Sequence, residues 1–176
     1  EDLSDVIYNI SPTDTPFMSA IAKTKATAVN HEWQLDSLAA ASATNAAIEG
    51  DEVSFSAPDA TTRKGNQCQI STKSVIVTAT LEAVNKAGRN SELAYQISKR
   101  SKELKRDMES SLTANNAPVT GNDSTARELA GLGSWLKTNQ SAGASGSAPG
   151  TSGTNARTDG TQRAFTEDQL KNVIKS

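Results

Sequence analysis

The longest regular hydrophobic pattern in the chain lies between Ser91 and Asn116. This stretch contains no Gly or Pro and is rich in residues with high helix propensity. Its apolar residues recur at steps of four or seven, which keeps them on one helix face. They are Leu93, Ile97, Leu104, Met108 and Leu112. The pattern predicts a helix of roughly 35–40 Å with a narrow apolar stripe. We expect Leu104, Met108 and Leu112 to be buried within the subunit.

The ends of this helix are marked locally. Asn90 or Ser91 can act as the N-cap, and Asn116-Ala117-Pro118 stops the helix. Outside the stripe, acidic and basic residues nearly balance. They are Glu92, Glu103, Asp107 and Glu109 against Lys99, Arg100, Lys102, Lys105 and Arg106. This balance predicts internal ion pairs rather than a phosphate-binding face.

Shorter helices are predicted near both ends of the chain. Residues 1–10 carry apolar residues on one side, and Thr15 with Pro16 has the sequence of an N-cap and a first helical position. At the other end, Thr166 and Gln169 fit a capping box, in which each side chain bonds the other residue's backbone. Phe165 and Leu170 are spaced as a hydrophobic staple.

Alternating patterns predict β-structure between these helices. Residues 29–35 read as a strand, and residues 53–57 begin a second alternation. A polar turn at 59–66 and a Val-, Ile- and Thr-rich return strand at Gln67–Leu81 follow. We therefore expect Ile48–Leu81 to form a long two-stranded arm. Because an isolated hairpin is marginal in water, it should pack on another subunit.

The remaining segments carry weaker patterns. Residues 82–88 and 124–130 are expected to form short helical turns. Residues 131–136 read as a turn followed by an apolar pair. Gln140–Gly160 is almost wholly Ser, Gly, Ala, Thr and Asn, a composition typical of a loop or a disordered segment.

Composition narrows the possible functions. Hydrophobic residues make up 35% and aromatic residues 4% of the 176 residues, which predicts a modest core that leans on neighbours. A net charge of −2 gives no long-range attraction to nucleic acid. The single cysteine, Cys68, excludes an internal disulfide framework and reads as a small hydrophobe on a strand. No apolar run is long enough to predict a membrane span.

Candidate chemistry is sparse. The single histidine, His31, lies in a strand-like run, and we assign it a structural or surface role. Glu49, Asp51 and Glu52 do not have the spacing of an EF-hand loop and read as a solvated turn. Trp135 reads as a local hydrophobic anchor, with a partner contact as the alternative. We predict that the protein is not an enzyme, with no cofactor and no catalytic, cofactor-binding or metal-binding residues.

Several long motifs carry a family resemblance. They are LSDVIYNISPTDTPFMSAI at Leu3–Ile21, HEWQLDSLA at His31–Ala39, EAVNKAGRNSELAYQISKRSKELKRDMESSL at Glu82–Leu112, GLGSWL at Gly131–Leu136 and DGTQRAFTEDQLK at Asp159–Lys171. Together they cover most of the chain. In these motifs and in its order of parts, the chain resembles the major capsid proteins of tailed bacteriophages with the Hong Kong 97-type fold, in the subgroup typified by the phage SU-ten.

The resemblance implies an α+β, Hong Kong 97-like capsid fold with a peripheral-domain sheet. The implied parts are an N-terminal arm (1–27), a strand and connector (28–47), an extended β-hairpin or E-loop (48–81), a peripheral domain (82–138) with a spine helix (91–116), a Gly/Ser-rich loop (139–164) and the start of a helix (165–176). That last helix would lead into an axial domain that is largely missing from this sequence.

The implied function is self-assembly into the icosahedral head shell that encloses phage DNA. The partners would be further copies in hexamers and pentamers, with scaffold, portal or decoration proteins, non-specific contact with DNA and no membrane. The protein would be assembled in the host cytoplasm and reside in the virion. An encapsulin-type nanocompartment shell and a hydrolase or prohead protease remain as alternatives. Nothing in the spacing supports an isopeptide cross-link from Lys64, near the expected loop tip, to Asn122 or Asn139.

Overall fold

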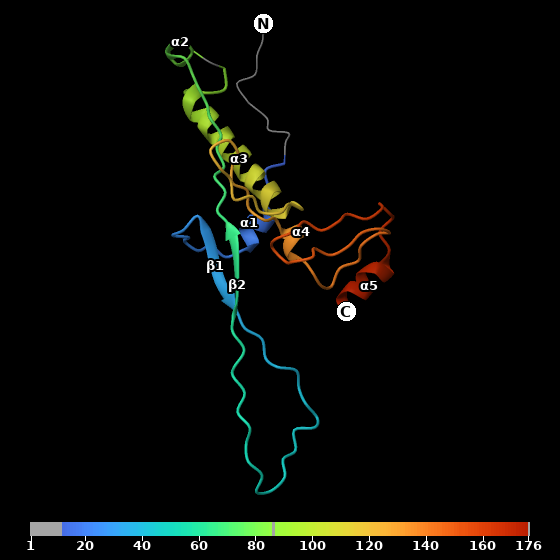
Figure 1. Ribbon diagram of the computed structural model, residues 1–176. Coiled ribbons are helices and arrows are strands. Elements are labelled where there is room, and N and C mark those ends of the chain that lie inside the picture. Colours follow the sequence, from blue (N-terminus) through green and yellow to red (C-terminus); the bar gives the residue numbers. More distant parts are fainter. Residues whose placement is uncertain (1–11, 86, 176) are drawn as a thin grey trace.

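The computed structural model describes residues 12–85 and 87–175 as an elongated molecule of mixed helix and sheet, in keeping with the α+β class (Figure 1). The element order is α1 (Pro16–Ala20), β1 (Asn30–Leu35), β2 (Thr62–Gln67), α2 (Ala79–Ala83), α3 (Glu92–Thr113), α4 (Leu132–Trp135) and α5 (Glu167–Lys175). The helix expected at 1–10 lies outside the described residues.

The long helix α3 confirms the strongest sequence prediction. Ser91, rather than Asn90, is its N-cap, and its Oγ accepts a hydrogen bond from the Ala94 N–H at 3.1 Å. A carboxylate oxygen of Glu82 accepts two more, from the N–H groups of Glu92 and Leu93 at 2.9 and 3.1 Å. Three of the N–H groups that a helix N-terminus leaves unpaired are thus satisfied from outside the helix.

The apolar stripe of α3 is less covered than its sequence predicts. Met108 is 36% exposed, and Leu93 and Ile97 are more exposed still. Leu104 and Leu112 are only half-buried. The prediction that Leu104, Met108 and Leu112 are buried is therefore wrong for the described part of the chain, because too little of it packs over this face.

The strand pairing also differs from the prediction. β1 pairs with β2 in antiparallel register, from Asn30 opposite Gln67 to Leu35 opposite Thr62. Residues 53–57 form no strand, and the predicted return strand 67–81 is a strand only at its first residue. The pattern of alternation indicates an extended backbone, but a ladder also requires a partner edge. Residues 62–66, which were predicted as part of a turn, have such a partner edge in β1.

A single loop, residues 36–61, therefore joins β1 to β2. This projecting loop extends beyond the body of the molecule (Figure 1). The predicted two-stranded arm is thus a short ladder at the base and a long loop beyond it.

Two of the short segments form other structures than expected. The helical turn expected at 82–88 lies earlier, as α2, where Thr78 Oγ1 accepts from the Leu81 N–H at 3.3 Å. The turns expected at 124–130 are not helical. Asn122 Oδ1 accepts N–H bonds from the two residues Ser124 and Thr125, and a β-bridge pairs Val119 with Glu128. An Asx-type turn thus competes with the helix.

The most buried residues gather where the C-terminal end of α3 meets α4. Ala130, Ser134 and Pro149 are buried. Trp135 packs against Trp33 with ring centroids 5.4 Å apart, and Gly153 also lies close to the Trp135 indole. The core is small and built of small residues, as the composition predicts.

The capping box of α5 forms on one side only. Thr166 Oγ1 accepts from the Gln169 N–H at 3.4 Å, as predicted. The Gln169 side chain instead donates from Nε2 to the Ala164 carbonyl at 3.2 Å. Phe165 and Leu170 are both exposed, so the predicted staple buries neither side chain well.

Candidate assembly surfaces

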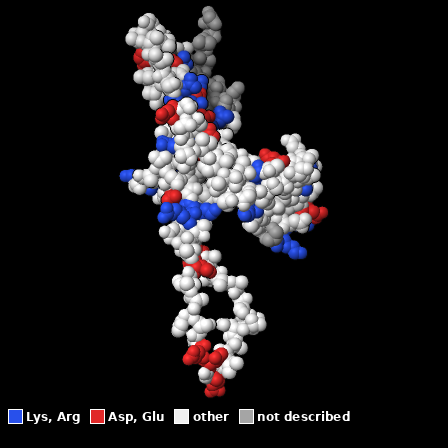
Figure 2. Space-filling view, viewed as in Figure 1, with Lys and Arg blue, Asp and Glu red and all other residues white. Residues whose placement is uncertain are grey.

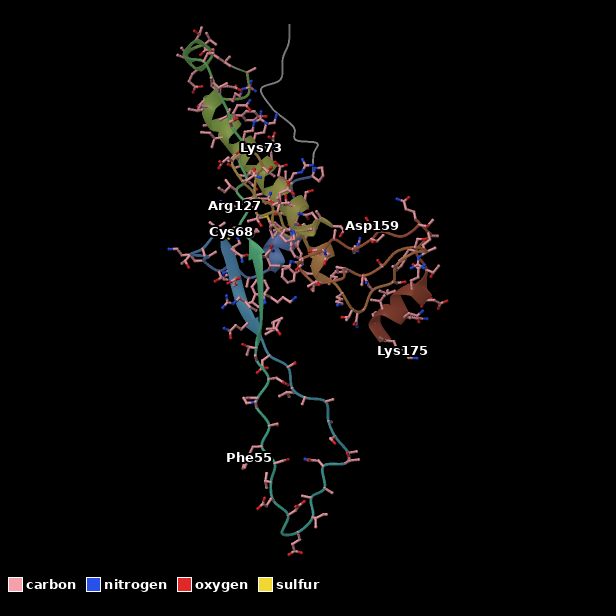
Figure 3. The ribbon with its side chains drawn as sticks, in the orientation of Figure 1. Phe55, Cys68, Lys73, Arg127, Asp159 and Lys175 are labelled. Atoms are coloured by element: carbon pink, nitrogen blue, oxygen red, sulfur yellow. The ribbon has the colours of Figure 1, made fainter. Side chains whose placement is uncertain are left out.

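The projecting loop presents hydrophobic side chains that the described chain leaves uncovered. Leu38 is 99% and Phe55 95% exposed, and Ile48 and Val53 are also largely exposed. In Figure 3 Phe55 lies on the projecting loop, far from the body of the molecule. Scattered exposed hydrophobic residues are ordinary on a protein surface, but a run of them on one extended loop marks an interaction surface.

The same loop carries charge of one sign. It contains five carboxylates and no Lys or Arg. They are Asp36, Glu49, Asp51, Glu52 and Asp59. Figure 2 shows acidic side chains gathered toward the far end of the loop, with none of the basic colour beside them. An acidic and apolar loop fits a partner surface that offers an apolar pocket and basic side chains.

Few hydrogen bonds shape the projecting loop from within. The Asp51 N–H donates to the Ile48 carbonyl at 3.2 Å, in a turn where Gly50 has a φ of +84°. Thr61 Oγ1 donates to Gln34 Oε1 at 3.0 Å where the ladder ends. The loop's direction is therefore set by β1 and β2 at its base.

That base is fixed to the body by side-chain contacts. The Asn66 side chain makes both possible bonds to Ala130, with Nδ2 donating to its carbonyl at 3.1 Å and Oδ1 accepting from its N–H at 2.8 Å. On the other strand Trp33 packs on Trp135. Both strands of the ladder are thus attached to the segment that carries α4.

The helix α1 is held by one carboxylate of α3. Glu109 accepts two hydrogen bonds, from the Phe17 N–H at 2.7 Å and the Met18 N–H at 2.8 Å. Thr15 occupies the N-cap position as predicted, but its side chain makes no capping bond. Glu109, 92 residues away from Phe17, supplies the cap in its place.

The ion pairs that the sequence predicts within α3 form only in part in the described chain. Arg100 bonds Glu103 at 2.6 Å, and Lys73 reaches Asp107 at 2.7 Å. The hydrogen bond from the Arg100 guanidinium holds the pKa of Glu103 below its ordinary value. Within the described ranges, no ion pair is found for the other basic residues of the helix, Lys99, Lys102, Lys105 and Arg106.

The structure places the other candidate residues apart. His31 is exposed, with its ring centroid 6.0 Å from that of Trp33. Lys64 lies in β2 opposite Trp33, so its predicted place near the loop tip is wrong. Asn122 caps its own turn, and Asn139 has a φ of 53° in a distant loop. Cys68 directly follows β2, and its Sγ donates to the Ala28 carbonyl at 3.4 Å.

Two kinds of site find no support in the described ranges. Within residues 12–85 and 87–175, His, Cys, Asp and Glu side chains do not gather in threes as a metal ion would require. Nor does any helix in those ranges combine the length and apolar character needed to cross a bilayer. Glu49, Asp51 and Glu52 are exposed on the projecting loop.

The contacts that position these surfaces come from residues that the sequence did not single out. Glu109 reads as one charge among many on α3, and Asn66 reads as a turn residue. Asn115 binds the backbone of Arg157 twice, at 2.9 Å each. All three contacts join residues at least 42 positions apart. No local pattern signals such pairs.

A projecting loop, a short helix α1 held by one carboxylate and a half-covered α3 are features typical of a subunit of a larger protein assembly. A family model described as SU10 major capsid protein matches residues 1–176, and the chain belongs to this family. The chain is also similar to a protein named major capsid protein from Escherichia phage Phieco32, at 38% identity over 108 residues. That match covers 61% of this chain and 31% of the relative, so the chain matches about a third of the relative's length.

Proposed function

We propose that this chain is the shell-forming part of a bacteriophage major capsid protein with a Hong Kong 97-like fold. The observation that carries the proposal is the projecting loop, whose hydrophobic side chains are almost fully exposed. Because the chain belongs to a capsid-protein family, we interpret this exposed surface as one that neighbouring subunits of the shell cover. The role is structural and not enzymatic.

The parts of the chain have distinct roles in this proposal. Residues 1–27 form the N-terminal arm, held to the spine helix α3 through Glu109. The projecting loop and its β1–β2 base form the E-loop. Residues 82–138 belong to the peripheral domain, and α5 leads toward an axial domain. The assembled protein resides in the virion, after assembly in the host cytoplasm.

The mechanism is assembly through repeated weak contacts. The E-loop of one copy lies on a neighbouring copy in hexamers and pentamers, and buries side chains such as Phe55 there. Burying one Phe contributes about 1.5–3 kcal/mol. The same contact recurs in every copy of a symmetric shell, so modest single contacts give a stable assembly. Scaffold, portal and decoration proteins are further partners, and DNA is contacted without sequence specificity.

Electron microscopy of the full-length protein tests this proposal. The wild-type protein should form closed shells. Phe55→Asp should prevent assembly or raise the protein concentration it needs by about tenfold or more, because each lost Phe contact is worth over 1.4 kcal/mol. Ser56→Asp is the matched control, since it adds the same charge to the same loop without removing a ring.

Two results would contradict the proposal. One is a wild-type protein that stays unassembled across a range of salt and crowding conditions. The other is a Phe55→Asp protein that forms shells at the wild-type concentration. Circular dichroism should show that Phe55→Asp leaves the fold unchanged, because Phe55 is 95% exposed in the subunit.

A further inference from the structure

We propose that one side of α3 binds the phosphate backbone of double-stranded DNA. Four exposed basic residues form this basic face, and they are Lys99, Lys102, Lys105 and Arg106. The basic face rests on the proposed function and deepens it, because that function encloses DNA in the shell but assigns no residue to the contact. Binding of DNA without sequence specificity comes from basic side chains on phosphates.

The carboxylates of α3 are all bound by groups close to them. Basic side chains pair with three of them, and N–H groups at the start of α1 bind the fourth. The pairs are Glu92 with Arg89, Glu103 with Arg100, Asp107 with Lys73, and Glu109 with Phe17 and Met18. In Figure 3 the label of Lys73 lies beside α3. The negative charges of this helix are therefore largely offset where they stand.

The basic residues of α3 are treated differently by the fold. Arg100 pairs with Glu103 at 2.6 Å. In residues 12–85 and 87–175, no ion pair involves any of the four residues of the basic face. The near balance of charges in the sequence predicted internal pairs, but two of the partner cations, Arg89 and Lys73, come from outside the helix. The helix thus keeps an excess of positive charge on its surface.

The excess charge lies on one side of the helix. An α-helix turns by about 100° per residue, so the four basic residues fall within an arc of about 120° and a length of about 10 Å. Among the residues of α3, Glu109 is the acidic one in this arc, and its carboxylate accepts the two N–H bonds from α1. The four cations therefore form one continuous positive stripe.

The basic face points away from the apolar stripe of α3. The centres of the two are about 140° apart around the helix axis. Lys73 meets the helix at Asp107, which lies between them, and α1 binds at Glu109, about one turn beyond Lys105. Packing over the apolar stripe would therefore leave the basic face accessible.

The size of the basic face suits a DNA duplex. About 10 Å of duplex carries roughly six phosphate charges, so each of the four cations can reach one. Lysine contacts phosphate as a flexible point charge, which gives affinity without reading bases. The chain's net charge of −2 provides no long-range attraction, so the contact forms where DNA is already close, as inside the proposed shell.

Another acidic surface could compete for the basic face, namely the projecting loop of a second copy. That loop also presents Phe55 and Val53, which need an apolar pocket. The Leu, Ile and Met residues of α3 lie on the other side of the helix, so the basic face does not offer them one. Phosphate groups need only the charge, and the geometry therefore favours DNA.

Titration of a labelled DNA duplex of mixed sequence with unassembled full-length subunit tests this site by fluorescence anisotropy. We expect a Kd of about 10⁻⁴–10⁻⁶ M. Contacts with four phosphates should make the logarithm of the affinity fall with the logarithm of the salt concentration at a slope of about −3.6. The affinity should therefore drop about a hundredfold between about 50 and 200 mM salt.

A pair of fourfold variants locates the contact. The basic-face variant should bind DNA at least about tenfold more weakly at about 50 mM salt and show almost no salt dependence. It combines Lys99→Gln, Lys102→Gln, Lys105→Gln and Arg106→Gln. The control variant loses the same total charge at other exposed sites and should keep the wild-type slope. It combines Lys23→Gln, Lys25→Gln, Lys171→Gln and Lys175→Gln.

Three results would overturn the basic face as a DNA site. One is a wild-type subunit with no measurable DNA binding at about 50 mM salt. Another is an equal slope for the wild type and the basic-face variant. The third is a basic-face variant that binds DNA normally but forms no shells, which would assign the face to a second copy. Binding by isolated subunits does not require shells, so a failure of shell formation in the wild type would contradict the proposed function separately.

Discussion

Two loop regions of this molecule, residues 36–61 and residues 137–164, differ both in composition and in how many hydrogen bonds hold them. The difference is the opposite of what composition alone would predict. The second is rich in Gly and Ser, yet backbone bonds join it internally. Ser147 and Thr158 exchange two such bonds, and the Gly153 N–H donates to the Ser134 carbonyl at 2.8 Å. The projecting loop contains alternating hydrophobic residues, yet few bonds hold it. Order in a loop follows from backbone bonds and contacts with the body more than from residue type.

Limited proteolysis should show the largest difference between the two loops. In the unassembled full-length subunit, a non-specific protease such as proteinase K should cut residues 36–61 at least about tenfold faster than residues 137–164. Cleavage requires the chain to open locally, and each 1.4 kcal/mol of opening free energy gives a factor of ten. Mass spectrometry of the fragments measures both rates. Equal rates would remove the distinction, and assembly into shells should protect the projecting loop.

The next largest effect is expected at Gly153. This residue has a φ of +74°, and a Cβ there would collide with the Trp135 indole. Gly153→Ala should lower the free energy of unfolding by about 3 kcal/mol through backbone strain and overpacking. Denaturant unfolding of the full-length subunit measures the change. Gly150→Ala is the control, because the nearest atom to its Cβ would be Asn155 Oδ1 at 3.6 Å. A similar loss in both variants would contradict this account.

Asn115 provides a smaller test of the same loop. Its side chain accepts from the Arg157 N–H and donates to the Arg157 carbonyl, so it closes the 137–164 region onto the end of α3. Asn115→Ala should lower the free energy of unfolding by about 2 kcal/mol, because the N–H and the carbonyl group of Arg157 both lose their hydrogen-bond partner. Asn45→Ala, in the exposed projecting loop, should stay within about 0.5 kcal/mol of wild type. If denaturant unfolding showed Asn45→Ala to be the more destabilising of the two variants, the proposed difference between the two loops would be contradicted.

The smallest effect concerns charge. The bond from Arg100 lowers the pKa of Glu103 from its ordinary value of 4.5. A lowered carboxyl pKa stabilises the fold above pH 4.5, and that contribution is lost as the pH falls through the lowered value. Glu103→Gln should therefore be slightly less stable than wild type at pH 7, and the difference should vanish in acid. Glu49→Gln, in the projecting loop, is the control and should stay within about 0.5 kcal/mol of wild type at pH 7. Unfolding curves at several pH values measure both.

N-cap residues and helix propensity, which are local features of the sequence, predicted the elements that depend on local contacts. The boundaries of α3 follow from Ser91 and from the lack of Gly and Pro, and the structure agrees within a few residues. The start of α1 at Pro16 was equally predictable. The family resemblance, carried by long motifs, is confirmed by the match over residues 1–176.

Elements that need a distant partner were not predictable from the sequence. Val53 and Phe55 alternate with polar residues as in a strand, but no edge faces them. Residues 62–67 are polar, yet they pair because β1 lies opposite. Likewise, the side-chain hydrogen bonds from Glu109 to α1 and from Asn66 to Ala130 join segments that are far apart in sequence. The local sequence pattern indicates whether a segment favours an extended or a helical backbone. Whether an extended segment becomes a paired strand depends on which other segment lies beside it in the fold.

The short ladder between β1 and β2 makes the projecting loop a lever. Six residue pairs form its pivot, and the tip lies up to about 40 Å away if half the loop runs out extended. A rotation of only about 10° at the pivot would then carry the tip by about 7 Å, two residues' length along a strand. A small rotation at the hydrogen bonds between Asn66 and Ala130 would thus become a large displacement at Phe55. In the shell that we propose, this amplification would let identical copies reach neighbours set at different angles.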